Sequence, residues 1–103
     1  MEYRVVVSRE AHSDIDEILS YMINTLKNPV AADSLLHRIE AAYETLADNP
    51  YLYAFCQDHR LKADGYRKVI IKNYILIYRV EEQEKQVYVV RVFYGRRNYA
   101  ELI

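Results

Sequence analysis

The pattern of hydrophobic and polar positions along the chain predicts one strand, two helices and then three more strands. Residues 3–7 are β-branched or aromatic apart from Arg4, which is typical of a strand. Between residues 11 and 26, hydrophobic side chains recur every three or four positions, which predicts an amphipathic helix of about four turns. This helix begins at Ser8 or, through an S-x-x-D capping pattern, near Ser13.

A second helix is predicted directly after the first. Asn28 can cap its start, and Pro29 suits its first position, where a missing N–H costs nothing. Hydrophobic residues then recur with helical spacing as far as Leu46. Asn49 ends the pattern because it precedes Pro50, and a residue before proline avoids the helical region. The short link between the two helices predicts an antiparallel helical hairpin.

The last third of the chain predicts a small sheet. Residues 66–72, 74–80 and 87–94 are rich in β-branched and aromatic residues, and only Asn73 and a charged loop separate them. Connections this short require antiparallel pairing. We therefore expect an α+β fold (β-α-α-β-β-β) in which a three-stranded antiparallel meander carries the helical hairpin on one face and ends in a short tail. The first strand joins at an edge or beside the last strand, and residues 51–65 form a loop.

Alternation along the strands sorts their side chains onto two faces. One face carries no charge, and we expect it to lie under the helices because a buried unpaired charge is costly; it comprises Tyr74, Leu76, Tyr78, Val80, Tyr88, Val90, Val92 and Tyr94. The other face mixes aliphatic residues with arginine and is expected to be an open binding surface; it comprises Ile75, Ile77, Arg79, Val87, Val89, Arg91 and Phe93, extended by Arg67, Val69 and Ile71. In the alternative interpretation, Arg79 and Arg91 only form salt bridges.

Composition narrows the class of protein. The 103 residues fit a single domain, 1–103, and the one cysteine excludes an internal disulfide. Charges stand where a signal peptide needs an apolar core, and no apolar run approaches the roughly 20 residues of a membrane span, so a cytoplasmic protein without membrane contact is expected. The three histidines lack metal-ligand spacing, and we expect neither metal nor cofactor. Residues 1–60 are acidic and residues 61–103 basic, which indicates a basic face that meets an acidic partner.

Two motifs, taken with the order of elements, resemble a known family. They are GYRKVIIKNYILIYRV (residues 65–80) and VVRVFYGRRNY (residues 89–99). Together they resemble the RelE/ParE toxins of bacterial type II toxin–antitoxin systems. The resemblance implies a toxin neutralised by a small cognate antitoxin protein. RelE-like members cleave mRNA in the ribosomal A site, whereas ParE-like members inhibit DNA gyrase without known chemistry of their own.

The basic and aromatic residues of this chain can be compared with what mRNA cleavage by RelE-like members requires. Such cleavage needs a group that orients the 2′-OH and cations that stabilise the developing phosphorane charge. The resemblance assigns these candidate catalytic roles to Arg67, Arg97 and Tyr99. The set is incomplete, because Ile75 stands at the strand-three arginine position and Val69 at a second basic position. We therefore favour a non-enzymatic inhibitor of a protein target such as DNA gyrase over a ribosome-dependent mRNA endonuclease; a third hypothesis is an inactive interaction domain.

The candidate partner-binding residues combine the mixed sheet face with the basic tail: Arg67, Ile75, Ile77, Arg79, Val89, Arg91, Tyr94, Arg96 and Arg97. Two substitutions test this assignment. Arg97→Ala should abolish toxicity with little loss of stability, because a tail arginine contributes little to folding. Ile77→Asp should weaken binding of the antitoxin if this face is open.

Overall fold

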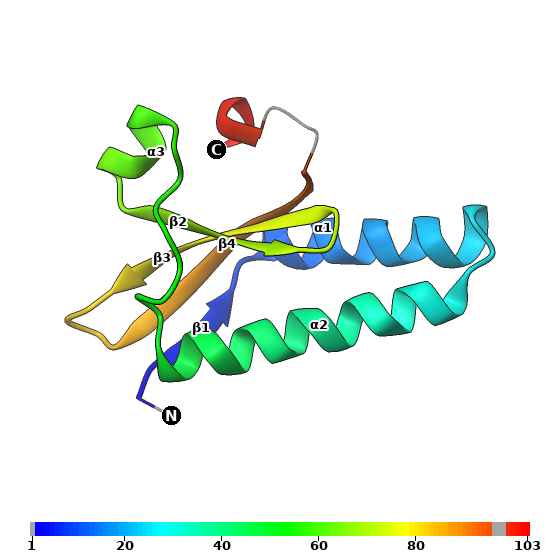
Figure 1. Ribbon diagram of the computed structural model, residues 1–103, viewed down its shortest axis with the longest axis horizontal. Helices are drawn as coiled ribbons and strands as arrows, with labels where there is room; N and C mark the ends of the chain where they lie inside the picture. The colour runs from blue at the N-terminus through cyan, green and yellow to red at the C-terminus, as the bar shows by residue number, and fades with distance from the viewer. Residues whose placement is uncertain (1, 96–98) are drawn as a thin grey trace.

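A four-stranded sheet carries a long helical hairpin on one face (Figure 1). The structure, a computed structural model, describes residues 2–95 and 99–103. Its elements follow the predicted order and form an α+β fold: β1 (Arg4–Val7), α1 (Arg9–Ser20), a π-helical turn η1 (Tyr21–Thr25), α2 (Pro29–Asp48), a short α3 (His59–Ala63), β2 (Tyr66–Ile71), β3 (Tyr74–Glu81), β4 (Gln86–Tyr94) and a 3-10 turn η2 (Tyr99–Leu102).

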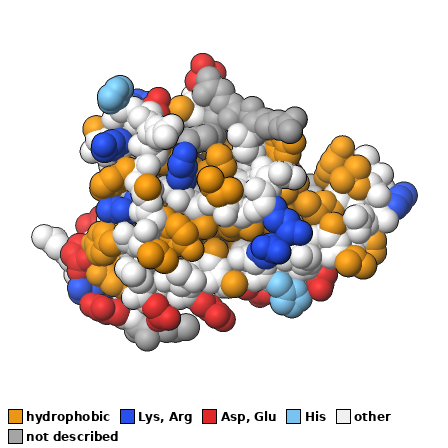
Figure 2. Space-filling view, viewed as in Figure 1, with side chains coloured by type: hydrophobic (Ala, Val, Ile, Leu, Met, Phe, Trp, Pro, Cys, Tyr) orange, Lys and Arg blue, Asp and Glu red, His pale blue; other side chains and the backbone are white. Residues whose placement is uncertain are grey.

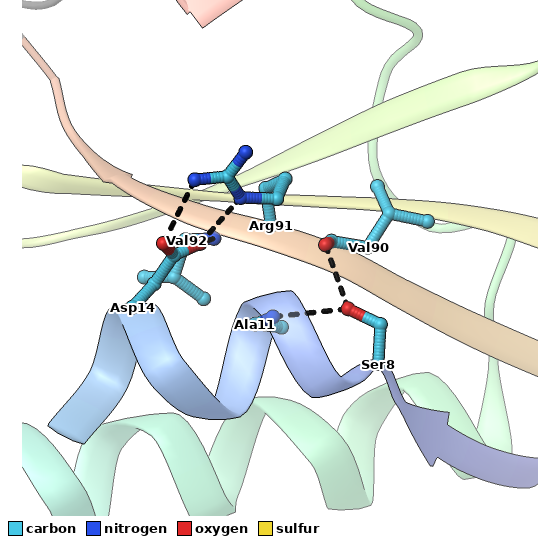
Figure 3. Close-up of polar contacts among 6 residues, drawn as sticks. All are labelled: Ser8, Ala11, Asp14, Val90, Arg91 and Val92. Atoms are coloured by element: carbon cyan, nitrogen blue, oxygen red, sulfur yellow. Dashed lines mark hydrogen bonds and ion pairs between the residues drawn. The ribbon is translucent and has the colours of Figure 1, made fainter. Parts of the chain in front are cut away.

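The helix caps explain where the hairpin begins and ends. Ser8 Oγ accepts a hydrogen bond from the Ala11 N–H at 3.0 Å and donates to the Val90 carbonyl at 2.8 Å, so Ser8 rather than Ser13 starts α1 (Figure 3). Asn28 Oδ1 accepts from the Ala31 N–H at 3.1 Å, and α2 runs from Pro29 to Asp48 as predicted. The Ser8 side chain therefore also connects the start of α1 to β4.

The sheet has the strand order β1-β4-β3-β2. β2, β3 and β4 form the predicted antiparallel meander. β1 lies at the edge next to β4 and runs parallel to it, with Arg4 opposite Gln86 and Val7 opposite Val89. The N-terminal strand therefore lies at an edge and also beside β4, so both of the placements that the sequence left open hold at once.

The main core lies between the hairpin and the sheet. Leu35, Ile39 and Leu46 of α2 pack with Leu76 and Tyr78 of β3, all at most 2% exposed. The buried Tyr78 hydroxyl donates to the Pro50 carbonyl at 2.7 Å and so satisfies a polar group inside this layer.

In two strands, β2 and β4, the side chains lie on the opposite face of the sheet from the one predicted. In β2, Val69 lies opposite Leu76, so Val69 and Ile71 belong to the core under the helices. In β4 an irregularity shifts the register so that Ile77 pairs with Arg91 while Tyr78 pairs with Val89. Val90 is the extra residue of this β-bulge, which reverses the alternation before it. Val87 and Val89 therefore point to the helices, and Tyr88 lies on the other face opposite Arg79.

The second face of the sheet is covered around Ile75 and Ile77 and is not open there. Cys56 and Leu61, both fully buried, pack on Ile75 and Ile77, with Ala100 and Ile103 of the C-terminal segment beside them. Figure 1 shows α3 and the C-terminal turn on the side of the sheet away from the hairpin. The expectation of an exposed aliphatic face was wrong because residues 51–65 show no regular period, so their capacity to bury a second face was missed.

Candidate functional site

An apolar groove lies between the far end of the helical hairpin and the turn that joins β2 to β3. Its volume is about 700 Å³. The helical wall is mostly apolar, with Glu17 of α1 as its one acidic side chain among the residues that line it; its other members are Ile18, Tyr21, Met22, Leu26, Ala31 and Leu35. The opposite wall comes from the ends of β3 and β4 and from the β2–β3 turn, with Tyr74, Tyr94 and Lys72. The groove therefore joins segments that are far apart in the chain.

The groove is open because the hairpin is longer than the sheet. Figure 1 shows α1 and α2 extending past the end of the strands. Tyr21 and Leu26 are 54% and 55% exposed, and Val30 at the start of α2 is 78% exposed. Figure 2 shows hydrophobic side chains gathered at this end of the molecule. A contiguous exposed apolar surface of this kind is typical of a protein-binding site.

The π-helical turn shapes this end of the hairpin. The Leu26 N–H donates to the Tyr21 carbonyl at 3.0 Å, and the Asn28 N–H donates to the Met22 carbonyl at 2.9 Å. A π turn rotates the following side chains relative to an α-helix and occurs often at functional sites. Here it leaves Tyr21 and Leu26 on the groove side, while Ile23 lines a separate, smaller groove of about 260 Å³ with residues of α1 and α2.

The strand wall of the groove is aromatic. The rings of Tyr74 and Tyr94 meet edge to face, with centroids 5.8 Å apart. Burial raises the pKa of Tyr74, and the neighbouring Tyr94 and Tyr21 raise it further. Tyr94 is 40% exposed. Its ring therefore packs against Tyr74 on one side and is accessible to a partner on the other. Such rings contribute large contact area at protein interfaces.

Gly95 connects the end of β4 to the groove wall. Its N–H donates to the Asn73 carbonyl at 2.7 Å, which holds the chain against the β2–β3 turn. A Cβ at this position would lie 3.1 Å from that carbonyl oxygen and 3.6 Å from the Ile75 side chain. Glycine is therefore the residue that lets β4 end so close to the turn.

The structure holds Arg67 against its own backbone and rings. Arg67 Nη1 donates to the Tyr53 carbonyl at 2.6 Å, and the guanidinium lies 3.9 Å from the centroid of Phe55. The same arginine lines a pocket of about 440 Å³ together with His59 and Lys62. Arg67 thus lies opposite Tyr78 on β3, away from the apolar groove.

Three of the candidate partner-binding residues are buried. Ile75, Ile77 and Val89 are 9%, 0% and 0% exposed. Ile75 and Ile77 lie under α3 and the C-terminal segment, and Val89 lies under the helices. The expected exposure of these three side chains is wrong: an unrecognised second layer covers the first two, and the bulge at Val90 turns the third inward.

The strand arginines Arg79 and Arg91 form ion pairs, which agrees with the alternative interpretation of these residues. Arg91 Nε lies 2.8 Å from Asp14 Oδ2, and the hydrogen bonds with Asp14 raise the pKa of Arg91 (Figure 3). Arg79 Nη1 lies 3.3 Å from Glu81 Oε2. Both guanidinium groups also lie over aromatic rings, at 4.5 Å from Phe93 for Arg91 and 5.2 Å from Tyr88 for Arg79.

The tail is described only in part. Arg96 and Arg97 lie outside the described residues, and Tyr99 begins η2. Of the candidate residues that the structure describes, Tyr94 lines the apolar groove. No set of His, Cys, Asp and Glu side chains suited to a metal ion occurs among residues 2–95 and 99–103. Within the same residues, no helix combines the length and apolar character of a membrane span.

The helical wall of the groove was missed by the sequence analysis. Met22 and Leu26 continue the hydrophobic stripe of the first helix, and nothing in the sequence distinguishes them from its buried members. One available signal was length. The 20 residues of α2 span about 30 Å, which the nine residues of β4 match, whereas the six residues of β2, the strand that ends at the groove, span only about 20 Å. Where the helical hairpin extends past the end of the strands, the sheet does not cover the hydrophobic stripe of the helices.

Comparison with known proteins places the chain in a family. Residues 5–99 match the family model described as the ParE toxin of the type II toxin–antitoxin system parDE. No match is found among curated proteins.

Solved structures share the fold. A structure of the chromosomal ParDE toxin–antitoxin system of Pseudomonas aeruginosa superposes with a TM-score of 0.71 at 18% identity, covering 90% of this chain and 96% of that one. The toxin–antitoxin complex RelBE2 of Mycobacterium tuberculosis gives 0.64 at 18% identity, with 91% and 99% covered. The archaeal RelE–RelB complex of Pyrococcus horikoshii gives 0.54 at 14% identity, with 94% and 99% covered. The family match over nearly the whole length shows that this chain belongs to the ParE toxins of type II toxin–antitoxin systems, within the RelE/ParE fold.

Proposed function

We propose that this toxin is neutralised by a cognate antitoxin protein that places an apolar segment in the groove between the hairpin and the β2–β3 turn. The observation that carries this proposal is the exposure of Tyr21, Leu26 and Val30 at 54%, 55% and 78% beside a groove of about 700 Å³. Burying such side chains under a partner is favourable by roughly 25 cal/mol per Å² of apolar surface. The mycobacterial and archaeal structures that share the fold are described as toxin–antitoxin and RelE–RelB complexes, which supports an antitoxin as the partner.

The proposed target of the free toxin is a protein, with DNA gyrase as the leading candidate. The family match is to ParE toxins, and the arginines of β2, β3 and β4 are engaged within the molecule. Arg67 is bonded to the Tyr53 carbonyl, Arg79 to Glu81 and Arg91 to Asp14. Stabilising a phosphorane requires cations directed at the substrate, whereas these three guanidinium groups are bonded within the protein. Their arrangement therefore favours a protein-binding surface over a catalytic site.

A second candidate function, mRNA cleavage on the ribosome, is favoured by one observation. Arg67 shares a pocket of about 440 Å³ with His59 and Lys62, which offers cationic groups beside the ring of Phe55. Arg97 and Tyr99 remain candidates for that chemistry on the sequence resemblance alone. The two functions differ in what the purified toxin does to gyrase and to mRNA.

The groove is tested by Leu26→Asp, with Leu52→Asp as the matched control. The two leucines are 55% and 59% exposed, and Leu52 lies outside the groove. Each variant is co-expressed with the protein encoded beside the toxin, and co-purification is measured. Leu26→Asp should lose the antitoxin and Leu52→Asp should retain it, because only Leu26 would bury its new charge under the partner. Retention by Leu26→Asp would exclude the groove as the binding site.

The target is tested by adding the purified free toxin to DNA gyrase in a supercoiling assay and to a translating ribosome preparation. Inhibition of supercoiling with intact mRNA is the expected outcome. Cuts in the translated mRNA with supercoiling unchanged would instead support the nuclease. Inactivity in both assays, together with unchanged growth on induction, would support the inactive interaction domain.

A further inference from the structure

Arg67, near the start of β2, lies over two exposed aromatic rings. Its guanidinium carbon is 3.9 Å from the ring centroid of Phe55 and 5.3 Å from that of Tyr51. Nη1 donates to the Tyr53 carbonyl at 2.6 Å, and a β-bridge holds Phe55 opposite Arg67. The arginine side chain is therefore fixed before any partner binds, so binding would lose little of its conformational entropy.

The guanidinium of Arg67 keeps hydrogen-bonding capacity for a partner. An arginine carries five N–H donors in a planar fork. Among residues 2–95 and 99–103, the Tyr53 carbonyl is the one hydrogen-bond acceptor of Arg67, and no carboxylate lies within 4.0 Å of it. A carboxylate accepts two parallel N–H bonds from such a fork. The remaining donors therefore suit an Asp or Glu side chain supplied by another molecule.

The pocket of about 440 Å³ beside this arginine is positively charged. His59 and Lys62 line it together with Arg67, and none of its lining residues in the described part of the chain is Asp or Glu. The neighbouring carboxylate of Asp58 accepts the Leu61 N–H at 3.0 Å and so caps α3. Figure 2 shows Lys and Arg side chains among hydrophobic ones on the side of the molecule where α3 lies. This charge is complementary to an acidic partner.

The side chains around Arg67 are apolar and accessible. Tyr51, Leu52 and Phe55 are 46%, 59% and 39% exposed, and with Arg67 they form what we call the arginine patch. Tyrosine and arginine are enriched among the residues that dominate the binding energy of protein interfaces. A partner that covers the rings would exclude water from the guanidinium, which strengthens a charge-assisted hydrogen bond. The composition of the patch is therefore that of a protein contact.

A protein segment fits the arginine patch better than a nucleic acid does. Glu82 accepts a hydrogen bond from the Tyr51 hydroxyl at the edge of the patch. Hydrogen bonds from Lys85, Tyr51 and Tyr3 lower the pKa of Glu82 to about 2, so this carboxylate is charged at neutral pH and opposes a phosphate backbone beside it. The chain also has a formal net charge of −1, whereas proteins that bind through phosphate contacts are usually basic.

We propose that Arg67 is the anchor through which the free toxin holds its target protein, and that it receives an Asp or Glu carboxylate from an exposed acidic segment of that protein. The inference rests on the proposed protein target and adds the surface that binds it. The fork of Arg67 meets the carboxylate, and Lys62 attracts further acidic side chains of the segment. Apolar residues of the segment cover Tyr51 and Leu52. The groove proposed for the antitoxin is lined by other residues, so the two partners contact different parts of the toxin.

The test uses the peptide acetyl-Ala-Glu-Leu-Glu-Ala-amide, the same peptide with Gln in place of Glu, and a short oligouridylate as a nucleic-acid probe. Each is titrated into the free toxin, and the NMR signal of the Arg67 Nε–H is followed. The Glu peptide should bind about tenfold more tightly than the Gln peptide, because only a carboxylate pairs with the charged fork. Equal affinity of the two peptides, no shift of the Arg67 signal, or tighter binding of the oligouridylate would each overturn the proposal.

Variants separate the geometry of the fork from its charge. Arg67→Lys keeps the positive charge and removes the fork, and Arg38→Gln, at an exposed position of α2 outside the patch, is the control. The Glu peptide should bind Arg67→Lys roughly tenfold more weakly than Arg38→Gln, and equal binding would contradict the anchor. If Arg67→Lys does not fold, Lys62→Glu is used, which places a carboxylate in the same pocket and should abolish the preference for the Glu peptide. An unchanged preference in that variant would contradict the charge argument.

The outcome is distinguishable from a failure of the proposed function. If the wild type inhibits supercoiling by gyrase and Arg67→Lys inhibits it equally, the protein target stands and the anchor is wrong. If the Glu peptide binds at Arg67 but the wild type leaves supercoiling unchanged and cuts mRNA, the carboxylate site stands and the assigned target is wrong. Each result therefore identifies whether the surface or the target has been assigned incorrectly.

Discussion

The carboxylate of Asp14 accepts two hydrogen bonds from the guanidinium of Arg91, from Nε to Oδ2 at 2.8 Å and from Nη2 to Oδ1 at 2.9 Å. Oδ2 also accepts the backbone N–H of Val92 at 3.0 Å. The Asp14 and Arg91 side chains are 13% and 27% exposed, so the pair is largely shielded from water. It fixes the first helix to the last strand, across 77 residues of sequence (Figure 3).

Asp14→Ala is expected to lower the free energy of unfolding by about 2–4 kcal/mol. The substitution leaves the Arg91 guanidinium without this carboxylate and the Val92 N–H without its acceptor. Urea denaturation followed by circular dichroism measures the change. Asp16→Ala, at an exposed position of the same helix, is the control and should change stability by less than about 0.5 kcal/mol. A similar small change for Asp14→Ala would show that the pair contributes little.

The acid dependence of stability is expected to include a contribution from Glu82. Hydrogen bonds from Lys85, Tyr51 and Tyr3 lower the pKa of Glu82 from 4.5 to about 2. A carboxyl whose pKa is lower in the folded protein contributes stability that is present above the unfolded pKa and is lost as pH falls through the folded one. The difference in stability between the wild type and Glu82→Gln should therefore be largest above about pH 4.5 and shrink towards about pH 2.

Denaturation at several pH values measures this contribution. Glu84→Gln, on the same exposed turn, is the control. It removes a carboxylate from the same turn and keeps the hydrogen bonds to Glu82. If Glu82→Gln and Glu84→Gln follow the same curve, the hydrogen bonds to Glu82 do not persist in solution.

Tyr78→Phe is expected to destabilise the protein by about 1–3 kcal/mol. The substitution leaves the Pro50 carbonyl, which the Tyr78 hydroxyl now bonds at 2.7 Å, without its donor inside the core. Burial also raises the pKa of Tyr78 to about 12, so the hydroxyl stays protonated at neutral pH. Tyr66→Phe is the comparison, because no hydrogen bond of the Tyr66 hydroxyl is found among the described residues. Thermal unfolding distinguishes them, and equal midpoints would refute the role of this bond.

Ile77→Asp is expected to prevent folding instead of testing a binding face. Ile77 is fully buried between the sheet and the second layer, so a carboxylate there would cost more than about 4 kcal/mol. Ile70→Asp, at a 67% exposed position on the outer strand β2, should remain folded. Soluble yield and circular dichroism of the two variants measure the difference. A folded Ile77→Asp protein would mean that the second layer is not closed.

The local features of the fold were predictable from the sequence. The second helix begins and ends where Asn28-Pro29 and Asn49-Pro50 place it, because caps and prolines act through neighbouring backbone groups. The meander followed from connection lengths, since two-residue and four-residue links allow few other arrangements. Residues within a few positions of each other determine these features, and a single sequence contains that information directly.

The faces of the strands and the site were less predictable, because they depend on partners that are distant in sequence. The bulge at Val90 is a mismatch between β3 and β4, and nothing in the alternation of β4 alone marks it. Which face of the sheet each β2 side chain lies on depends on Val69 pairing with Leu76 of β3. The sequence alone does not reveal this register. The groove exists because the hairpin and the sheet differ in length, so only their relative placement reveals that Leu26 is uncovered.

The pairing of β1 with β4 has a consequence for the order of folding during synthesis. The Ser8 side chain and the Val90 carbonyl that it bonds are 82 residues apart, and β1 pairs with residues 86–89. Contacts of such long sequence separation form late, because a large loop must close first. A nascent chain cannot complete the sheet until β4 has left the ribosome. A chain that ends before Gln86 lacks the strand that pairs with both β1 and β3, so we expect such a fragment not to complete the sheet.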